Sequence, residues 1–354
     1  MAQTYKVCVE TLKSFGFSEE DAKRGAEVLY ESDLRGVESH GIARLQFYAD
    51  FIRSGMINKD AELELVSETR SMAYMNGHDG LGIVQAPRAM DLAIEKARNE
   101  GIGLVSVTHA GHFGIAGYYA LKAARQDMIG FAIANAVPIV AAYGGKGAVM
   151  GNSPFSIAFP KGDDGREPTM IDAACSVVAG GKIEIQIRKG EQLPLGWCVD
   201  KDGNDTTDPW SILKDGGALL PFGGIKGYCL NTMFEMLAAV LPGAATGVDV
   251  GYPALNQHPH EDIGYFFLAI DPSRLRPLAD LKKDIGYFND KLKSTPPKEG
   301  LPEVFLPGEI EFRNVKKIEE KGVDLNINVV KDLLRIGIEY GRLPADATLD
   351  DVFK

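Results

Sequence analysis

IGLVSVTHAGHFGIAGYYALKAARQDMIGFAIAN, residues 102–135, is the stretch that decides the fold. Its first part, 102–107, is a short apolar run typical of a buried strand. A helical pattern follows over 114–126, and the apolar run 129–135 is typical of another strand. A strand, a helix and a strand in this order predict a right-handed crossover unit. We therefore expect an α/β sheet at the centre of the protein.

Elements on both sides of this stretch extend the α/β pattern. Ser18 is predicted to cap a helix that begins with acidic residues and ends near Gly36, and a second helix starts near Gly41. Residues 87–100 have the apolar spacing of an amphipathic helix. Further strands are predicted over 155–159, 169–171, 196–199 and 265–270, and further helices over 228–241, 278–293 and 329–341. Residues 243–262 are predicted to form a loop.

The composition limits the class of protein. The chain has 354 residues, of which 45% are hydrophobic and 25% charged, as expected for one large domain or two joined ones. A net charge of -11 argues against nucleic acid or an anionic membrane as the main partner. The four cysteines lack paired spacing, so neither a disulfide framework nor a zinc knuckle is predicted. Without an apolar signal core or spanning run, the protein is expected to be cytoplasmic.

A group of polar residues near Arg44 is the first candidate site. On a helix that begins near Gly41, Arg44 and Tyr48 lie one turn apart, and His40 lies just before them. A guanidinium binds a carboxylate through two parallel hydrogen bonds, and an imidazole exchanges protons near neutral pH. This combination suits a 2-hydroxy or 2-oxo acid. The alternative is a solvated polar face with Ser39 as the helix cap.

His112 is the second candidate, because it lies between a predicted strand and a predicted helix. Loops at the carboxyl ends of strands commonly bind ligands, so His112 could act in acid–base chemistry. The alternative is a loop histidine that is hydrogen-bonded to backbone. His109 and His112 also form a His-x-x-His pair, but a metal site would need a further ligand, and no acidic residue is near in sequence. No metal site is predicted.

Glycine-rich segments suggest where a phosphate could bind. Gly111, Gly114 and Gly117 have the spacing G-x-x-G-x-x-G, and the next strand ends at Asn135 without an acidic residue, so an ordinary Rossmann site is excluded. Lys226 stands in a glycine-rich loop before an apolar helix, a setting that favours an anion. A flexible surface loop with a solvated lysine is the alternative.

Six blocks of sequence, in order, resemble the malate/L-lactate dehydrogenase family that is distinct from the Rossmann-type lactate and malate dehydrogenases. The blocks are Ser39–Leu45, His112–Tyr119, Gly144–Lys146, Asp172–Ala174, Leu220–Gly227 and Leu306–Glu309. The resemblance covers roughly residues 5–345. The same family includes ureidoglycolate and sulfolactate dehydrogenases, diketogulonate reductase and piperideine-carboxylate reductase.

The resemblance implies an architecture and an activity. It implies a mixed-sheet, non-Rossmann NAD(P)-binding domain over residues 76–274. Residues 1–75 and 275–354 would form a second, helical domain for substrate binding and homodimer formation. The implied enzyme transfers hydride between NAD, or alternatively NADP, and a small 2-hydroxy or 2-oxo acid, with malate or L-lactate favoured. Substrates of the ureidoglycolate, sulfolactate or diketogulonate type, or a catalytically silent carboxylate-binding protein, are the alternatives.

The resemblance also implies roles for individual residues. His112 would transfer the proton with help from His40 and Ser39, and substrate would be bound by Arg44, Tyr48 and Asn152. The residues expected to contact the cofactor are Phe113, Gly114, Ile115, Ala116, Asp172, Ala173, Ala174, Gly180, Gly181, Lys226, Gly227, Pro307, Gly308 and Glu309.

Two positions depart from the family pattern. The family often has Gly-Thr-Asn-Pro where this chain has Gly-Asn-Ser-Pro at 151–154, which changes the hydrogen-bond donors available to a substrate. Some reductases of the family carry an acidic residue as a proton relay at the position of Lys182. That relay is not expected here, which disfavours imine reduction.

Overall fold

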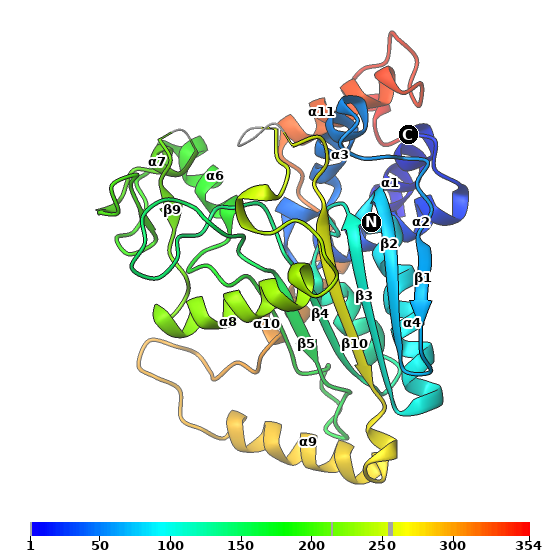
Figure 1. The fold of residues 1–354 in the computed structure, drawn as a ribbon, viewed down its shortest axis with the longest axis vertical. Helices are drawn as coiled ribbons and strands as arrows, with labels where there is room; N and C mark the ends of the chain where they lie inside the picture. Colours follow the sequence, from blue (N-terminus) through cyan, green and yellow to red (C-terminus); the bar gives the residue numbers. More distant parts are fainter. Residues whose placement is uncertain (1, 214, 254–257) are drawn as a thin grey trace.

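A mixed sheet forms the centre of the computed structural model, which describes residues 2–213, 215–253 and 258–354 (Figure 1). In the described residues this sheet has seven strands, in the order β1 (Glu64–Glu68), β2 (Met72–Gly80), β3 (Ile102–Ala110), β10 (Ile263–Ile270), β4 (Ile129–Ala134), β5 (Phe155–Ala158) and β6 (Met170–Ala173). β2 and β3 are parallel, whereas the other neighbouring strands are antiparallel. The predicted α/β class with a mixed sheet is confirmed.

The crossover unit predicted from residues 102–135 is present, with one addition. β3 and β4 run in the same direction and are joined through α5 (Ala116–Ala124). They are not neighbours, because β10 lies between them and pairs antiparallel with both. The sequence pattern identified all three strands but did not predict this insertion.

Helices cover both faces of the sheet. α4 (Gly82–Glu100) packs on β2, β3 and β10, while α5 packs on β4, β5 and β6. α2 (Glu19–Leu34) lies against α4, and α1 (Ala2–Ser14) lies against α2. The opposite face is covered by α8 (Ile225–Glu235) and the π-helical turn η3 (Met236–Val240). Because both faces are covered, β10 is buried over five consecutive residues, 263–267.

The segment before α3 (Leu45–Ser54) is irregular for a specific reason. Instead of starting as an α-helix near Gly41, it forms two short 3₁₀ turns over 38–40 and 42–44. The buried Asp33 carboxylate accepts the N–H of Ile42 at 2.9 Å. A Cβ on Gly41 would lie 1.7 Å from Asp33 Oδ1, so only glycine fits against this carboxylate. The contact places Arg44 at the start of α3.

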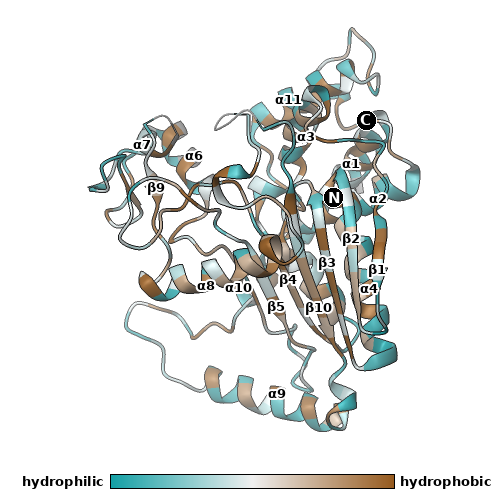
Figure 2. Cartoon of the chain, viewed as in Figure 1, coloured by the Kyte–Doolittle hydropathy of each residue, from teal (hydrophilic) through white to brown (hydrophobic). Residues whose placement is uncertain are grey.

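The remaining elements surround this centre. A smaller sheet in the order β8 (Asp205–Thr206), β7 (Cys198–Val199) and β9 (Ala218–Leu219) lies with α6 (Gly180–Lys189) and α7 (Trp210–Leu213) at the left of Figure 1. The C-terminal helices are α9 (Leu278–Lys293), α10 (Glu309–Lys321) and α11 (Ile327–Glu339). Figure 2 shows α9 banded in teal and brown, as expected for an amphipathic helix at the periphery.

The structure leaves two of the sequence predictions untested in whole or in part. Residues 254–257 of the predicted loop lie outside the described residues. β1 and the first four residues of β2 precede residue 76, so the main sheet includes part of the segment assigned to the terminal domain. The division at 75/76 and 274/275 stays a prediction. None of the described helices is both long and apolar enough to cross a membrane.

Candidate active site

The loop after β3 and the first turn of α3 bring His112 and Tyr48 together. The hydroxyl of Tyr48 lies 3.0 Å from His112 Nδ1, and the Tyr48 side chain is fully buried. The backbone N–H of Gly114 donates to the same nitrogen at 3.3 Å, and the Tyr48 hydroxyl can either donate to it or accept from it. When Nδ1 carries the proton, Nε2 is the ring nitrogen that can take a proton from a bound substrate.

Three more predicted residues surround this pair. The His40 ring is tilted against the His112 ring at a centroid distance of 5.4 Å, and Ser39 Oγ lies 2.9 Å from His40 Nδ1. Arg44 donates from Nε to the carbonyl of Ser39 at 2.8 Å. Within the described part of the chain, Arg44 makes no ion pair, so its terminal nitrogens remain available for a carboxylate.

Burial sets the protonation of this cluster. It lowers the pKa of His112 well below its usual 6.5, and the positive charge of Arg44 and the nearby His40 lower it further. Burial and Arg44 also lower the pKa of His40 to about 3. Both imidazoles are therefore neutral at neutral pH, which is the form that accepts a proton from a hydroxyl group.

Glu261 joins the cluster, although the sequence analysis did not identify it. Its carboxylate accepts the backbone N–H of His112 at 3.0 Å, and only 2% of the residue is exposed. Burial raises the pKa of Glu261 to about 7, against the opposing effects of the His112 N–H and Arg44. The contact joins residues 149 positions apart, and the charged segment around Glu261 looked like an ordinary loop.

The segment 170–177, which contains β6, connects most of the predicted cofactor blocks. The N–H of Met170 donates to the carbonyl of Pro307 at 3.2 Å, which places the 307–309 block beside β6. The N–H of Phe222 donates to the carbonyl of Cys175 at 3.1 Å, which places the 220–227 block beside its end. Blocks that are far apart in sequence therefore meet along one segment.

Asp172 lies on this segment, and Asn152 hydrogen-bonds to it. The carbonyl of Asn152 accepts the N–H of Cys175 at 2.6 Å. Asp172 faces the start of α5, where a Cβ on Gly117 would lie 2.3 Å from its Oδ2. Burial raises the pKa of Asp172 to about 6, while the N–H of Gly117 favours its charged form. Asp172 can thus present a hydrogen-bonding carboxyl group beside a closely packed backbone.

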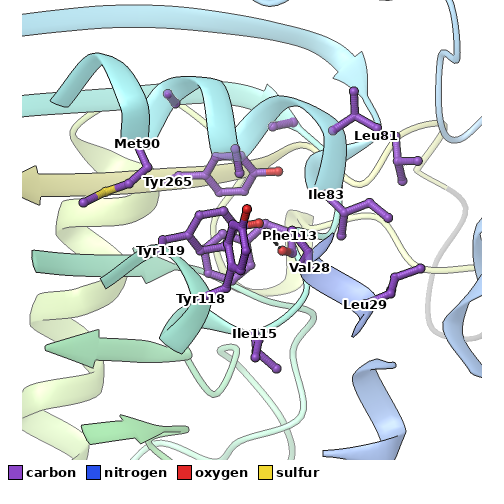
Figure 3. Close-up of a cluster of buried hydrophobic side chains, with 14 of the residues drawn as sticks. Val28, Leu29, Leu81, Ile83, Met90, Phe113, Ile115, Tyr118, Tyr119 and Tyr265 are labelled. Carbon is purple, nitrogen blue, oxygen red and sulfur yellow. Dashed lines mark hydrogen bonds between the residues drawn. The ribbon is translucent and has the colours of Figure 1, made fainter. Parts of the chain in front are cut away.

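The Phe113 side chain is buried in the core and does not lie along the segment 170–177. Figure 3 shows it within an aromatic cluster, with its ring centroid 5.0 Å from that of Tyr119 and 5.1 Å from that of Tyr265. Ile115 and Ala116 are also buried. Any contact of Phe113 with a cofactor must therefore come from its backbone.

Helix N-termini and Lys226 fit the phosphates of a dinucleotide. α6 begins at the predicted Gly180 and Gly181, α8 follows Gly224, and neither helix start has a side-chain cap. Lys226, in the first turn of α8, is exposed and makes no ion pair with the described residues. Free N–H groups, the helix dipole and a lysine together favour a phosphate. A Cβ on Gly227 would lie 1.7 Å from the Phe222 carbonyl, so this turn requires glycine.

The other charged candidates have partners within the protein. Glu309, in the first turn of α10 after Gly308, accepts from Lys293 at 3.0 Å and from the N–H of Leu306 at 2.9 Å. His109 pairs with Asp262 at 2.7 Å. Over the described ranges, no group of three or more His, Cys, Asp or Glu side chains is arranged to hold a metal ion.

Comparisons with known proteins identify the family of the chain. Residues 1–334 match the family described as malate/L-lactate dehydrogenase. An L-sulfolactate dehydrogenase from Methanocaldococcus jannaschii is 41% identical over 336 residues, 95% of each chain. A malate dehydrogenase from Pyrococcus horikoshii is 37% identical over 346 residues, 95% of this chain and 94% of the relative. The crystal structure of a malate dehydrogenase from Entamoeba histolytica matches with a TM-score of 0.92 at 31% identity, covering 98% of both chains. The chain therefore belongs to the malate/L-lactate dehydrogenase family.

Proposed function

We propose that this protein interconverts malate and oxaloacetate, or L-lactate and pyruvate, with a nicotinamide cofactor. Family membership supports an NAD(P)-dependent dehydrogenase of 2-hydroxy acids. The observation that carries the proposal is the convergence of Arg44 and Tyr48 with His112, from two distant segments. The cluster supplies both a carboxylate-binding group and a proton-exchanging group.

Each residue of the cluster has a proposed task. The guanidinium of Arg44 binds the C1 carboxylate of the substrate through two hydrogen bonds. His112 takes the proton of the 2-hydroxyl group at Nε2 during oxidation and returns it during reduction. Tyr48 hydrogen-bonds to Nδ1, which also lies 3.3 Å from the Gly114 N–H, and keeps the ring in place. His40, oriented by Ser39, donates to the same substrate oxygen, and Asn152 adds a polar contact.

Cofactor binding would use the segment around β6. Lys226 and the start of α8 would hold phosphate groups, and Asp172 would bind ribose hydroxyls. The predicted residues 113–116, 173–174, 180–181, 227 and 307–309 would line the remaining surface. When bound, the nicotinamide ring donates or accepts the hydride.

The low pKa of His112 predicts how oxidation depends on pH. Because burial lowers this pKa, the neutral imidazole persists as the pH falls through 6.5. We expect kcat/KM for the 2-hydroxy acid to stay level through pH 6.5 and to fall only at lower pH. The full pH–rate profile is measured for wild type and for Glu261→Gln, because burial raises the pKa of Glu261 to about 7 and an inflection from this group is absent from the variant. A midpoint at or above 6.5 that persists in Glu261→Gln contradicts the prediction.

A substrate panel tests the proposed function. Oxaloacetate, pyruvate and sulfopyruvate are mixed separately with the enzyme and NADH or NADPH, and the loss of nicotinamide absorbance is recorded. We expect the highest kcat/KM with oxaloacetate or pyruvate. Sulfolactate is the second candidate, because the relative named for it is 41% identical. No absorbance change with any 2-oxo acid would indicate a silent carboxylate-binding protein.

We propose NAD as the cofactor, with NADP as the alternative. The names of relatives support both. A ureidoglycolate dehydrogenase (NAD(+)) from Escherichia coli is 30% identical over 319 residues, and a (2R)-3-sulfolactate dehydrogenase (NADP(+)) from Chromohalobacter salexigens is 32% identical over 267 residues. The panel decides between them by kcat/KM with each cofactor. A cytoplasmic location stays a prediction from the N-terminal sequence.

We also propose that the protein is a homodimer that uses the outer face of α8 and η3. The inner face of these helices packs Phe234 and Leu237 on the sheet. The outer face leaves Ile225, Met233 and Val240 exposed by 54%, 50% and 57%. A helix that is apolar on all sides is normally buried, so a second copy would cover this face.

A charge placed on this face should separate the subunits. We expect Met233→Glu to shift the mass measured by light scattering from that of a dimer to that of a monomer, because a buried unpaired carboxylate opposes association. Leu275→Glu, at an exposed apolar residue before α9, is the matched control and should remain dimeric. A dimeric Met233→Glu protein would show that the contact lies elsewhere.

A further inference from the structure

Side chains from other elements anchor the loop that carries His112. The carbonyl of Gly111 accepts a hydrogen bond from the hydroxyl of Tyr265 on β10. The N–H of the same peptide group, that of His112, donates to Glu261 at 3.0 Å. These two anchors lie on either side of the same peptide bond, so together they fix its orientation.

Glu261 is an unusual anchor, because it is ionisable and buried. A Cβ on Gly111 would lie 3.0 Å from Glu261 Oε2, which shows that the carboxylate packs directly against the loop backbone. Burying a carboxyl group costs more free energy than burying the hydroxyl group that anchors Gly111. The His112 N–H offsets part of this cost through a charge-assisted hydrogen bond. Glu261 therefore provides a strong hydrogen-bond acceptor at the Gly111–His112 peptide, and the orientation of this peptide sets the position of the imidazole.

The neighbours of Glu261 hold it from both sides. Nδ1 of His260 lies 3.6 Å from the Asp79 carboxylate at the end of β2. Asp262 pairs with His109, near the end of β3, at 2.7 Å. Each residue of the segment 260–262 thus contacts the end of β2 or β3 or the loop that follows. The residues on both sides of Glu261 therefore hold it beside the ends of β2 and β3.

We propose that Glu261 is a positioning residue, which holds the His112 peptide so that the imidazole meets both Tyr48 and the substrate oxygen. The inference rests on the proposed function, in which His112 exchanges the proton. It adds a residue that acts through the backbone and does not touch the substrate. Misplacing a reacting group by about 1 Å can lower the rate by about 100-fold.

Two variants separate the hydrogen bond from the charge. Glu261→Ala removes the acceptor, and we expect kcat for 2-oxo acid reduction to fall by about 100-fold with little change in KM, since Arg44 still binds the carboxylate. Glu261→Gln keeps an acceptor oxygen and should retain most of kcat. Hydrogen exchange at the His112 amide gives a second readout. It should become at least about tenfold faster in Glu261→Ala and stay near wild type in Glu261→Gln.

Asp164→Ala is the matched control, because Asp164 is a buried carboxylate that accepts a backbone N–H, that of Arg166 at 3.1 Å, away from His112. It should change neither readout. A Glu261→Ala enzyme with wild-type kcat and wild-type exchange at His112 would overturn the inference. Wild-type protein that reduces no 2-oxo acid would instead defeat the proposed function, and amide exchange would still decide whether Glu261 holds His112.

Discussion

His112→Gln is expected to lower kcat for 2-oxo acid reduction by about 10²–10⁴-fold, the usual contribution of general acid–base catalysis. Glutamine can form hydrogen bonds to Tyr48 and to the substrate, but it cannot exchange a proton at neutral pH. Steady-state kinetics with oxaloacetate or pyruvate measure the loss. Cofactor affinity, followed by nicotinamide fluorescence, should not change, because in the proposed site the imidazole contacts the substrate and not the cofactor.

A surface histidine supplies the control for this experiment. His78 lies near the end of β2, where its Nε2 pairs with Glu64 at 2.6 Å, outside the cluster. His78→Gln should retain wild-type kcat. If His112→Gln also kept full turnover with intact cofactor binding, proton transfer would have to be assigned to His40.

Arg44→Met should be the most damaging change for substrate binding. Each charge-assisted hydrogen bond to a carboxylate contributes about 1.5–3 kcal/mol, and every 1.4 kcal/mol is tenfold. Losing two of them should lower kcat/KM for the 2-oxo acid by about 100-fold or more, mainly through KM. Arg44 also holds the Ser39 carbonyl at 2.8 Å, so part of the loss would come from the 39–40 segment.

Two further variants show whether geometry or charge matters at this position. Arg44→Lys keeps the positive charge but loses the paired donors, so it should recover only part of kcat/KM. Arg53→Met, on the same helix, removes an arginine that binds Glu339 at the surface and should leave the kinetics unchanged. A KM in Arg44→Met close to that of wild type would show that another group binds the carboxylate.

Local sequence patterns were sufficient to predict those elements whose structure depends mainly on their own residues. The helix predicted over 278–293 coincides with α9, because its apolar and charged positions alternate with helical spacing. Ser18 was predicted to cap α2, and its hydroxyl accepts the Asp21 N–H at 3.1 Å. Spacing alone could not decide whether Arg44 and His112 form a site. The ordered blocks that resemble a known family favoured a site, and the structure brings the two residues together.

Features that depend on distant contacts were not predicted. Glu261 was not predicted, because its contact with His112 depends on the fold, which brings residues 260–262 beside the loop after β3. β2 was missed because its alternation includes polar residues such as Asn76, and its pairing with β3 depends on the crossover through α4. The burial of the Phe113 ring followed from its stacking on Tyr265, which lies on the inserted strand β10.

The insertion of β10 also has a consequence for how the chain is made. In the strand order of the described residues, β10 joins the half formed by β1, β2 and β3 to the half formed by β4, β5 and β6. During synthesis, β3 and β4 can pair with β2 and β5, but each keeps one open apolar edge until residues 263–270 emerge. Pairing between segments so far apart is slow, and open edges of this kind favour aggregation. Biosynthesis of this enzyme therefore includes an interval in which two open strand edges face each other without the strand that joins them.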